Sequence, residues 1–168
     1  MQPETRPYGI AAGIAGAYAV LLALIGWWPR HVDSGLGLVD QPVVHSLADA
    51  LSVPPGHVVA AGEVMANVVL FVPIGLFLAL GWRRASIGVA AVVALAVSVG
   101  IEVVQWLAPI DRTASAVDVV VNVAGGCLGF VAVRAVRGRP RAQRWVVGGL
   151  SVIVLLVAAV LVRGLTVS

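Results

Sequence analysis

The chain has 168 residues, of which 60% are hydrophobic and 11% are charged, and its mean hydropathy is +1.02. Soluble domains carry about 25% charged residues, so this composition excludes an ordinary soluble protein and indicates an integral membrane protein. The net charge of +3 comes from 11 basic residues, all arginine, at the ends of apolar runs, which indicates membrane orientation and argues against nucleic-acid binding.

Five apolar runs reach or approach the roughly 20 residues that a helix needs to cross about 30 Å of hydrocarbon. We therefore expect an all-α bundle of about five transmembrane helices in a single membrane domain spanning residues 1–168. The first run ends in an interfacial Trp27-Trp28 pair without a small-residue cleavage site, so we expect it to be retained. The expected spans are residues 8–28, 64–82, 85–107, 117–136 and 145–162.

The arginines predict how these helices cross the membrane. If the N-terminus is cytoplasmic, eight arginines lie inside and three lie outside, as the positive-inside rule requires. The strongest signal is the link between the fourth and fifth spans, which contains four arginines. We therefore expect a multi-pass protein of the cytoplasmic (inner) membrane, with its N-terminus in the cytoplasm and its C-terminus outside.

The longest connection, residues 29–62, is expected to be an external loop that contains a short helix. Asp40 can cap this helix, with Pro42 in its first turn, and Pro54, Pro55 and Gly56 can end it. We expect a helix that lies on the outer leaflet and acts as a lid; a loop helix that merely covers the bundle is the alternative. Its apolar face has helical spacing and consists of Val43, Val44, Leu47, Ala50 and Leu51.

Each of the three central spans carries a polar stripe near its outer end, with members three or four residues apart and therefore on one helix face. An ionised carboxylate near the middle of a membrane helix costs about 2.5–3.5 kcal/mol, so such groups indicate a functional site. Because these outer ends lie together in the expected topology, the stripes should converge. They are Glu63 and Asn67, then Glu102 and Gln105, then Asp118 and Asn122.

Small and special residues predict how the helices pack. The stripe of the fourth span continues through Gly125, Gly126 and Gly129, a spacing that allows close contact with another helix. In the second span, Phe71 lies one turn from Asn67. Pro73 removes a backbone hydrogen bond and is expected to kink the helix.

Structural and functional interpretations of the polar residues both stand. Asn67, Gln105 and Asn122 could be interhelical hydrogen-bonding groups with a structural role alone. For Glu102 a functional role is favoured, because an apolar side chain would pack better, whereas Asp118 and the loop residue Arg112 fit either role. Glu63 is interpreted as a first-turn acid favoured by the helix dipole. If the protein is an enzyme, its acid and base would be Glu102 and Asp118, and Arg112 would hold an anion.

Other kinds of chemistry find little support in the sequence. His31, His45 and His57 have no i+3 or i+4 spacing, and no metal site or cofactor is expected. Cys127 is the only cysteine, so no internal disulfide can form. No phosphate-binding loop, nucleophile elbow or zinc-protease motif occurs.

Two strings resemble the VanZ-like family of bacterial membrane proteins over residues 63–136. They are ANVVLFVPIGLFLALG (residues 66–81) and SVGIEVVQWLAPIDRTASAVDVVVNVAGGCLGF (residues 98–130). Between Arg112 and Asp118 the match to the family pattern is loose. Residues 1–62 and the fifth span are not tied to the family by any motif. The pattern falls on Asn67, Phe71, Pro73, Gly75, Glu102, Gln105, Arg112, Asp118, Asn122, Gly125 and Gly126.

The family takes its name from a protein associated with teicoplanin resistance, and the resemblance implies a membrane protein of the bacterial cell envelope. The leading hypothesis is a non-enzymatic protein whose outward polar pocket binds an amphiphile, such as a lipoglycopeptide or an isoprenoid-linked wall intermediate. Membrane lipids are the other expected partners. The alternatives are an enzyme acting on a lipid-linked phosphate or sugar, and a small transporter or scaffold. The expected ligand-binding residues are Asn67, Glu102, Gln105, Arg112, Asp118 and Asn122.

Overall fold

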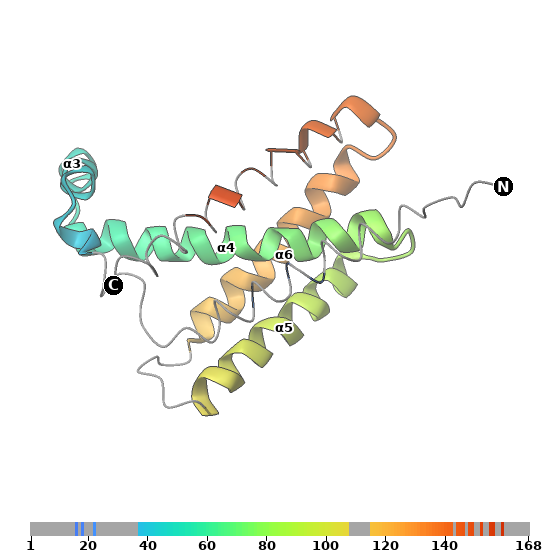
Figure 1. Cartoon of the computed structure of the whole chain (residues 1–168), viewed down its shortest axis with the longest axis horizontal. Helices are drawn as coiled ribbons and strands as arrows, with labels where there is room; N and C mark the ends of the chain where they lie inside the picture. The colour runs from blue at the N-terminus through green and yellow to red at the C-terminus, as the bar shows by residue number, and fades with distance from the viewer. Residues whose placement is uncertain are drawn as a thin grey trace.

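The computed structural model describes residues 37–107 and 115–142, together with Gly16, Tyr18, Leu22 and a few residues between 144 and 159. In these ranges all regular structure is helical, which confirms the all-α prediction. Figure 1 shows the arrangement of the long helices. The elements are η1 (Leu38–Asp40), α3 (Pro42–Leu51), α4 (Pro55–Gly81), α5 (Ile87–Leu107) and α6 (Ala116–Ala135).

Three of these helices, α4, α5 and α6, are long and apolar enough to cross a membrane. The chain is therefore a multi-pass membrane protein, and three of the five predicted spans coincide with helices that could cross a membrane. The first and fifth spans fall largely on residues outside the described part. Helices α5 and α6 begin and end within two residues of their predicted limits.

Helix α4 begins nine residues earlier than predicted. The Pro54-Pro55-Gly56 sequence was expected to end the loop helix, but Pro55 is the first residue of α4, where its missing N–H costs nothing. Glu63 is consequently in the third turn and exposed, so its interpretation as a first-turn acid is wrong. Helix α4 continues without a break through the buried Pro73, and the kink stays a prediction.

Helix α3 occupies the predicted place, but its N-terminal cap does not. Asp40 belongs to η1, and the N-cap residue of α3 is Gln41, which makes no side-chain capping bond. The predicted Asp40 cap is therefore wrong, because the 3₁₀ turn places this side chain one residue too early. At the other end, Ser52 adopts a left-handed conformation with φ of 54°, and its N–H donates to the carbonyls of Ala48 and Asp49.

The apolar side chains of α3 are mostly exposed. Only Ala48 is buried, whereas Val43, Leu47 and Leu51 are 63%, 48% and 65% exposed. In Figure 1, α4 lies across the view, and α3 is seen nearly end-on beside the N-terminal end of α4. An apolar stripe that the described residues leave uncovered suits the interfacial position predicted for this helix. Its role as a lid stays a prediction.

Glycines allow α4 and α6 to contact each other backbone to backbone. A Cβ atom at Gly75 would collide with the backbone of Gly126 and Phe130 in α6. A Cβ at Gly125 or at Gly129 would likewise meet the carbonyl of Val68 or of Val72 in α4. The close packing predicted from the glycine spacing is thus confirmed, and it fixes the crossing that positions the polar residues.

Helix α5 packs mainly on α6, where Ala94 lies against Gly126. Apolar residues on both sides of the glycine contact complete the core. One cluster consists of Leu76, Ala79, Ala85, Ala90, Phe130 and Val133, and the other of Leu22, Leu70, Phe71 and Ala94. Leu22, from the first predicted span, therefore contributes to the same core.

Candidate functional site

A hydrogen bond joins the polar stripes of α4 and α6. The amide Nδ2 of Asn67 donates to Oδ1 of Asp118 at 3.1 Å, and both side chains are half-buried. Asp118 is the third residue of α6, where the helix dipole favours a negative charge. Among the described residues no arginine pairs with Asp118, so an uncharged amide is the donor that holds this carboxylate.

One turn deeper in α6, Asn122 connects to α5. Its Nδ2 donates to Oγ of Ser98 at 2.9 Å, and the two residues are only 6% and 1% exposed. The other end of the amide differs, because the carbonyl oxygen Oδ1 of Asn122 is buried and accepts no hydrogen bond in the described part of the chain. Leaving a buried acceptor without a hydrogen bond costs about 1–3 kcal/mol of folding free energy, so a donor that reached this oxygen would be bound favourably.

The third contact ties the end of α5 to the start of α6. Oε2 of Glu102 accepts the backbone N–H of Ser115 at 3.2 Å, and Ser115 is the N-cap residue of α6. This N–H has no partner within the helix, so the carboxylate satisfies a group that would otherwise be left open. Gln105 lies one turn further along the same face of α5 and is only 4% exposed. Glu102 is half-buried.

Together these contacts place polar groups of three helices at one end of the bundle. Helix α6 is central, because Asp118 contacts α4 whereas Asn122, four residues later, contacts α5. Asn67 therefore contacts Asp118 directly. Glu102 is connected to α6 through the backbone N–H of Ser115, the residue before this helix. Arg112 lies outside the described residues, and its predicted place beside the carboxylates stays a prediction.

Sequence reasoning missed the parts played by two serines. The polar stripes predicted from the sequence include neither Ser98 nor Ser115, whereas in the structure the hydroxyl of Ser98 accepts from the amide of Asn122 and the backbone N–H of Ser115 donates to the carboxylate of Glu102. A signal for Ser98 was present, since it stands four residues before Glu102 and so extends the polar face of α5 by one turn.

The chemistry offered by this polar end is that of hydrogen-bond acceptors. Two carboxylates and the free Oδ1 of Asn122 suit hydroxyl, amide N–H or ammonium donors. Within the ranges that the structure describes, no group of three or more His, Cys, Asp or Glu residues could hold a metal ion.

Comparison with known proteins gives one match. The VanZ/LLP1 family model matches residues 16–137. No curated protein and no solved structure matches the chain. The match extends the resemblance found over residues 63–136 to residues 29–62 and to most of the first predicted span, which no motif had tied to the family. Because residues 16–137 are well over half of the 168 residues, the chain belongs to the VanZ/LLP1 family.

Proposed function

We propose that this VanZ-family membrane protein binds the polar part of an amphiphilic cell-envelope ligand at the end of the bundle where α5 meets α6. A lipoglycopeptide or an isoprenoid-linked wall intermediate has the required chemistry, since both carry hydroxyl and amide donors next to a lipid chain. Binding of a lipoglycopeptide would lower susceptibility to teicoplanin. The proposed ligand-binding residues are Asn67, Glu102, Gln105, Arg112, Asp118 and Asn122.

The observation that supports this proposal most strongly is the unpartnered Oδ1 of Asn122. A purely structural asparagine would be expected to use both ends of its amide, because an open acceptor costs about 1–3 kcal/mol. Interhelical hydrogen bonds in membranes return only about 0.6 kcal/mol on average, which does not offset that cost. Ala94 of α5 also packs directly on Gly126 of α6, so the asparagine is not the only contact that holds these two helices together.

The carboxylates support the same interpretation. Glu102 and Asp118 each accept a hydrogen bond from an uncharged N–H, and both remain half-buried rather than sealed. Asp118 can therefore accept a further donor from a ligand that enters from the membrane interface. Arg112 would meet a phosphate or carboxylate on the same ligand, because guanidinium groups pair with such anions.

The test is teicoplanin susceptibility in a bacterial host that expresses the protein. The expected result is that Glu102→Ala removes any protection while the protein inserts at unchanged abundance. A matched control is Val120→Ala, on the exposed face of α6 two residues from Asp118. Protection equal to that of the wild type in the Glu102→Ala strain would contradict the proposal.

The two carboxylates at one end favour a second candidate, an enzyme that acts on a lipid-linked phosphate or sugar. Glu102 or Asp118 would then act as general base, and Arg112 would hold the anion. Lipid profiling of a strain that lacks the protein separates the candidates. An enzyme leaves accumulated substrate and missing product, whereas a binding protein leaves the lipid pool unchanged.

A further inference from the structure

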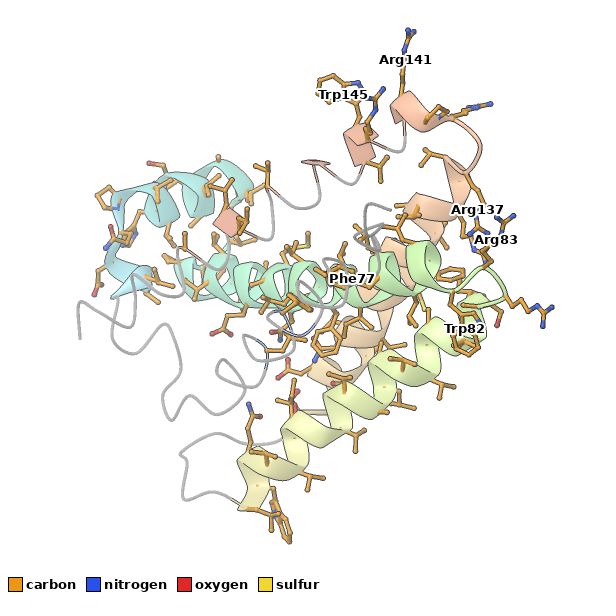
Figure 2. All side chains as sticks on the ribbon, turned by 45° about the vertical axis from the view of Figure 1, so that its right-hand side comes forward. Phe77, Trp82, Arg83, Arg137, Arg141 and Trp145 are labelled. Atoms are coloured by element: carbon orange, nitrogen blue, oxygen red, sulfur yellow. The ribbon has the colours of Figure 1, made fainter. Side chains whose placement is uncertain are left out.

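The opposite end of the bundle is strongly basic. The turn between α4 and α5 contains Arg83 and Arg84, and the end of α6 with the segment after it contains Arg134, Arg137, Arg139 and Arg141. Figure 2 shows Trp82, Arg83 and Arg137 at this end, with Arg141 and Trp145 on the segment beyond α6. Two stretches of sequence about 50 residues apart therefore supply one cationic surface.

Two of these arginines hold the stretches together. Nη2 of Arg134 donates to the carbonyls of Arg83 and Ala85, and Nη2 of Arg137 donates to the carbonyl of Ala79 at 3.2 Å. The guanidinium group of Arg134 also lies 5.0 Å from the ring centre of Phe130. Both cations satisfy carbonyls at or just beyond the C-terminal end of α4, where positive charge is favoured. Arg134 and Arg137 thus have structural work at this end.

The other four arginines at this end have no comparable structural role. The side chains of Arg83, Arg84, Arg139 and Arg141 are exposed and make no hydrogen bond or ion pair within the described residues. The sequence contains no acidic residue between Glu63 and Glu102, and none after Asp118. The parts of α4, α5 and α6 that lie near this surface therefore contain no carboxylate that could neutralise it.

Two tryptophans indicate which anion this surface meets. Trp82 is 51% exposed and directly precedes Arg83, and Trp145 is 82% exposed beyond Arg141. Exposed tryptophans at the ends of membrane helices lie at the level of the lipid headgroups. The free guanidinium groups therefore lie at the depth of phospholipid phosphates, and basic side chains close to a membrane surface attract anionic lipids.

We propose that this basic end binds anionic phospholipid headgroups through the exposed side chains of Arg83, Arg84, Arg139 and Arg141. Each guanidinium group can donate two parallel hydrogen bonds to phosphate oxygens. The site is separate from the proposed ligand site, since it shares no residue with it and lies at the other end of α5 and α6.

The test uses the full-length protein in nanodiscs that contain phosphatidylcholine mixed with cardiolipin or phosphatidylglycerol. After extraction in mild detergent, native mass spectrometry measures which lipids remain bound. The wild type should retain the anionic lipid in preference to phosphatidylcholine. Each of the double variants R83Q/R84Q and R139Q/R141Q should lower the retained anionic lipid at least about fivefold, because each arginine near an anionic surface adds to the attraction.

Two matched variants identify the chemistry. R83K/R84K keeps the charge but loses the planar pair of donors, and should retain an intermediate amount of anionic lipid. The side chains of the four arginines make no hydrogen bond or ion pair with the described residues, so thermal unfolding of the variants should match the wild type and show that they are folded. Lipid retention in proportion to the bulk mixture, or unchanged retention in both glutamine variants, would overturn the proposal. Displacement of the lipid by inorganic phosphate or by short RNA at equal charge concentration would also overturn the proposal, because it would show a site for soluble anions.

Discussion

At the scale of single residues, the contact between Ser98 and Asn122 is the most buried polar pair that the structure describes. The bond measures 2.9 Å, and the two side chains are only 1% and 6% exposed. The same pair leaves Oδ1 of Asn122 open, so it positions an acceptor as well as joining two helices. The free energy of the Ser98–Asn122 hydrogen bond should therefore be measurable in the protein without a ligand.

We predict that a double-mutant cycle between Ser98→Ala and Asn122→Ala gives a favourable coupling free energy of about 0.6–1.7 kcal/mol, the range found for interhelical hydrogen bonds in membranes. The cycle isolates the pair because each single change removes the same bond. Equilibrium unfolding in mixed SDS and dodecylmaltoside micelles measures it. Val99→Ala, next to Ser98 on the exposed face of α5, is the control that should show no coupling to Asn122→Ala. Coupling near zero for the Ser98 cycle would show that the bond is not formed in the folded protein.

The sequence allowed the carboxylates and amides of this site to be predicted, because polar groups in apolar runs carry a cost that calls for a reason. It did not allow their partners to be predicted. Whether Asn122 meets Ser98 or Asn67 depends on the rotation of α6 against α5 and α4, and the spacing of residues along one helix does not determine that rotation. Ser98 was also inconspicuous, because a serine in a membrane helix costs little.

At the scale of helices, the α4–α6 crossing depends on glycines, and a single methyl group should disturb it. We predict that Gly75→Ala lowers the free energy of unfolding by about 2 kcal/mol. Overpacking costs roughly 1–3 kcal/mol or more, and the helix preference of alanine returns at most about 1 kcal/mol. The backbone atoms of Gly126 and Phe130 that the Cβ would meet cannot move aside as a side chain can.

The matched control for this change is Gly100→Ala in α5, where an added Cβ would meet nothing within 4 Å. Its effect should be neutral or slightly stabilising, since alanine is the better helix former. Unfolding of both variants in the same mixed micelles provides the comparison. Equal stabilities for the two variants would mean that α4 and α6 do not contact each other at Gly75.

The limits of α5 and α6 could be predicted from sequence to within two residues, because turns and a loop interrupt long apolar runs there. The start of α4 could not. Proline ends one helix and begins another equally well, so Pro55 fits both assignments, and only the packing of the following turns decides between them. The same ambiguity led to the wrong placement of Glu63 in a first turn.

At the scale of the whole molecule, the two ends of the bundle differ in charge. Carboxylates and amides gather where α5 meets α6, and arginines gather at the α4–α5 turn and after α6. From the positive-inside rule we predict that the arginine end lies in the cytoplasm. The proposed ligand site would then face outward, where an antibiotic or a wall intermediate would be encountered.

This orientation can be tested by cysteine labelling in intact cells, in a background that replaces the lone Cys127. We predict that a cysteine in place of Ser52, after α3, reacts with a membrane-impermeant maleimide. A cysteine in place of Arg139, after α6, should react only once the cells are permeabilised. The reverse pattern would place the polar end in the cytoplasm and would remove the argument for an extracellular ligand.

The length of α4 has a consequence for how the molecule sits in different membranes. Its 27 residues span about 40 Å, whereas the 20 or 21 residues of α6 and α5 span about 30 Å, close to the hydrocarbon thickness of a bilayer. Because the glycine contact holds α4 to α6, α4 cannot slide to absorb this difference, and its first turns project together with α3. A thinner bilayer would expose more of that projection and a thicker one would draw it in, so lipid chain length sets the height of α3 above the membrane.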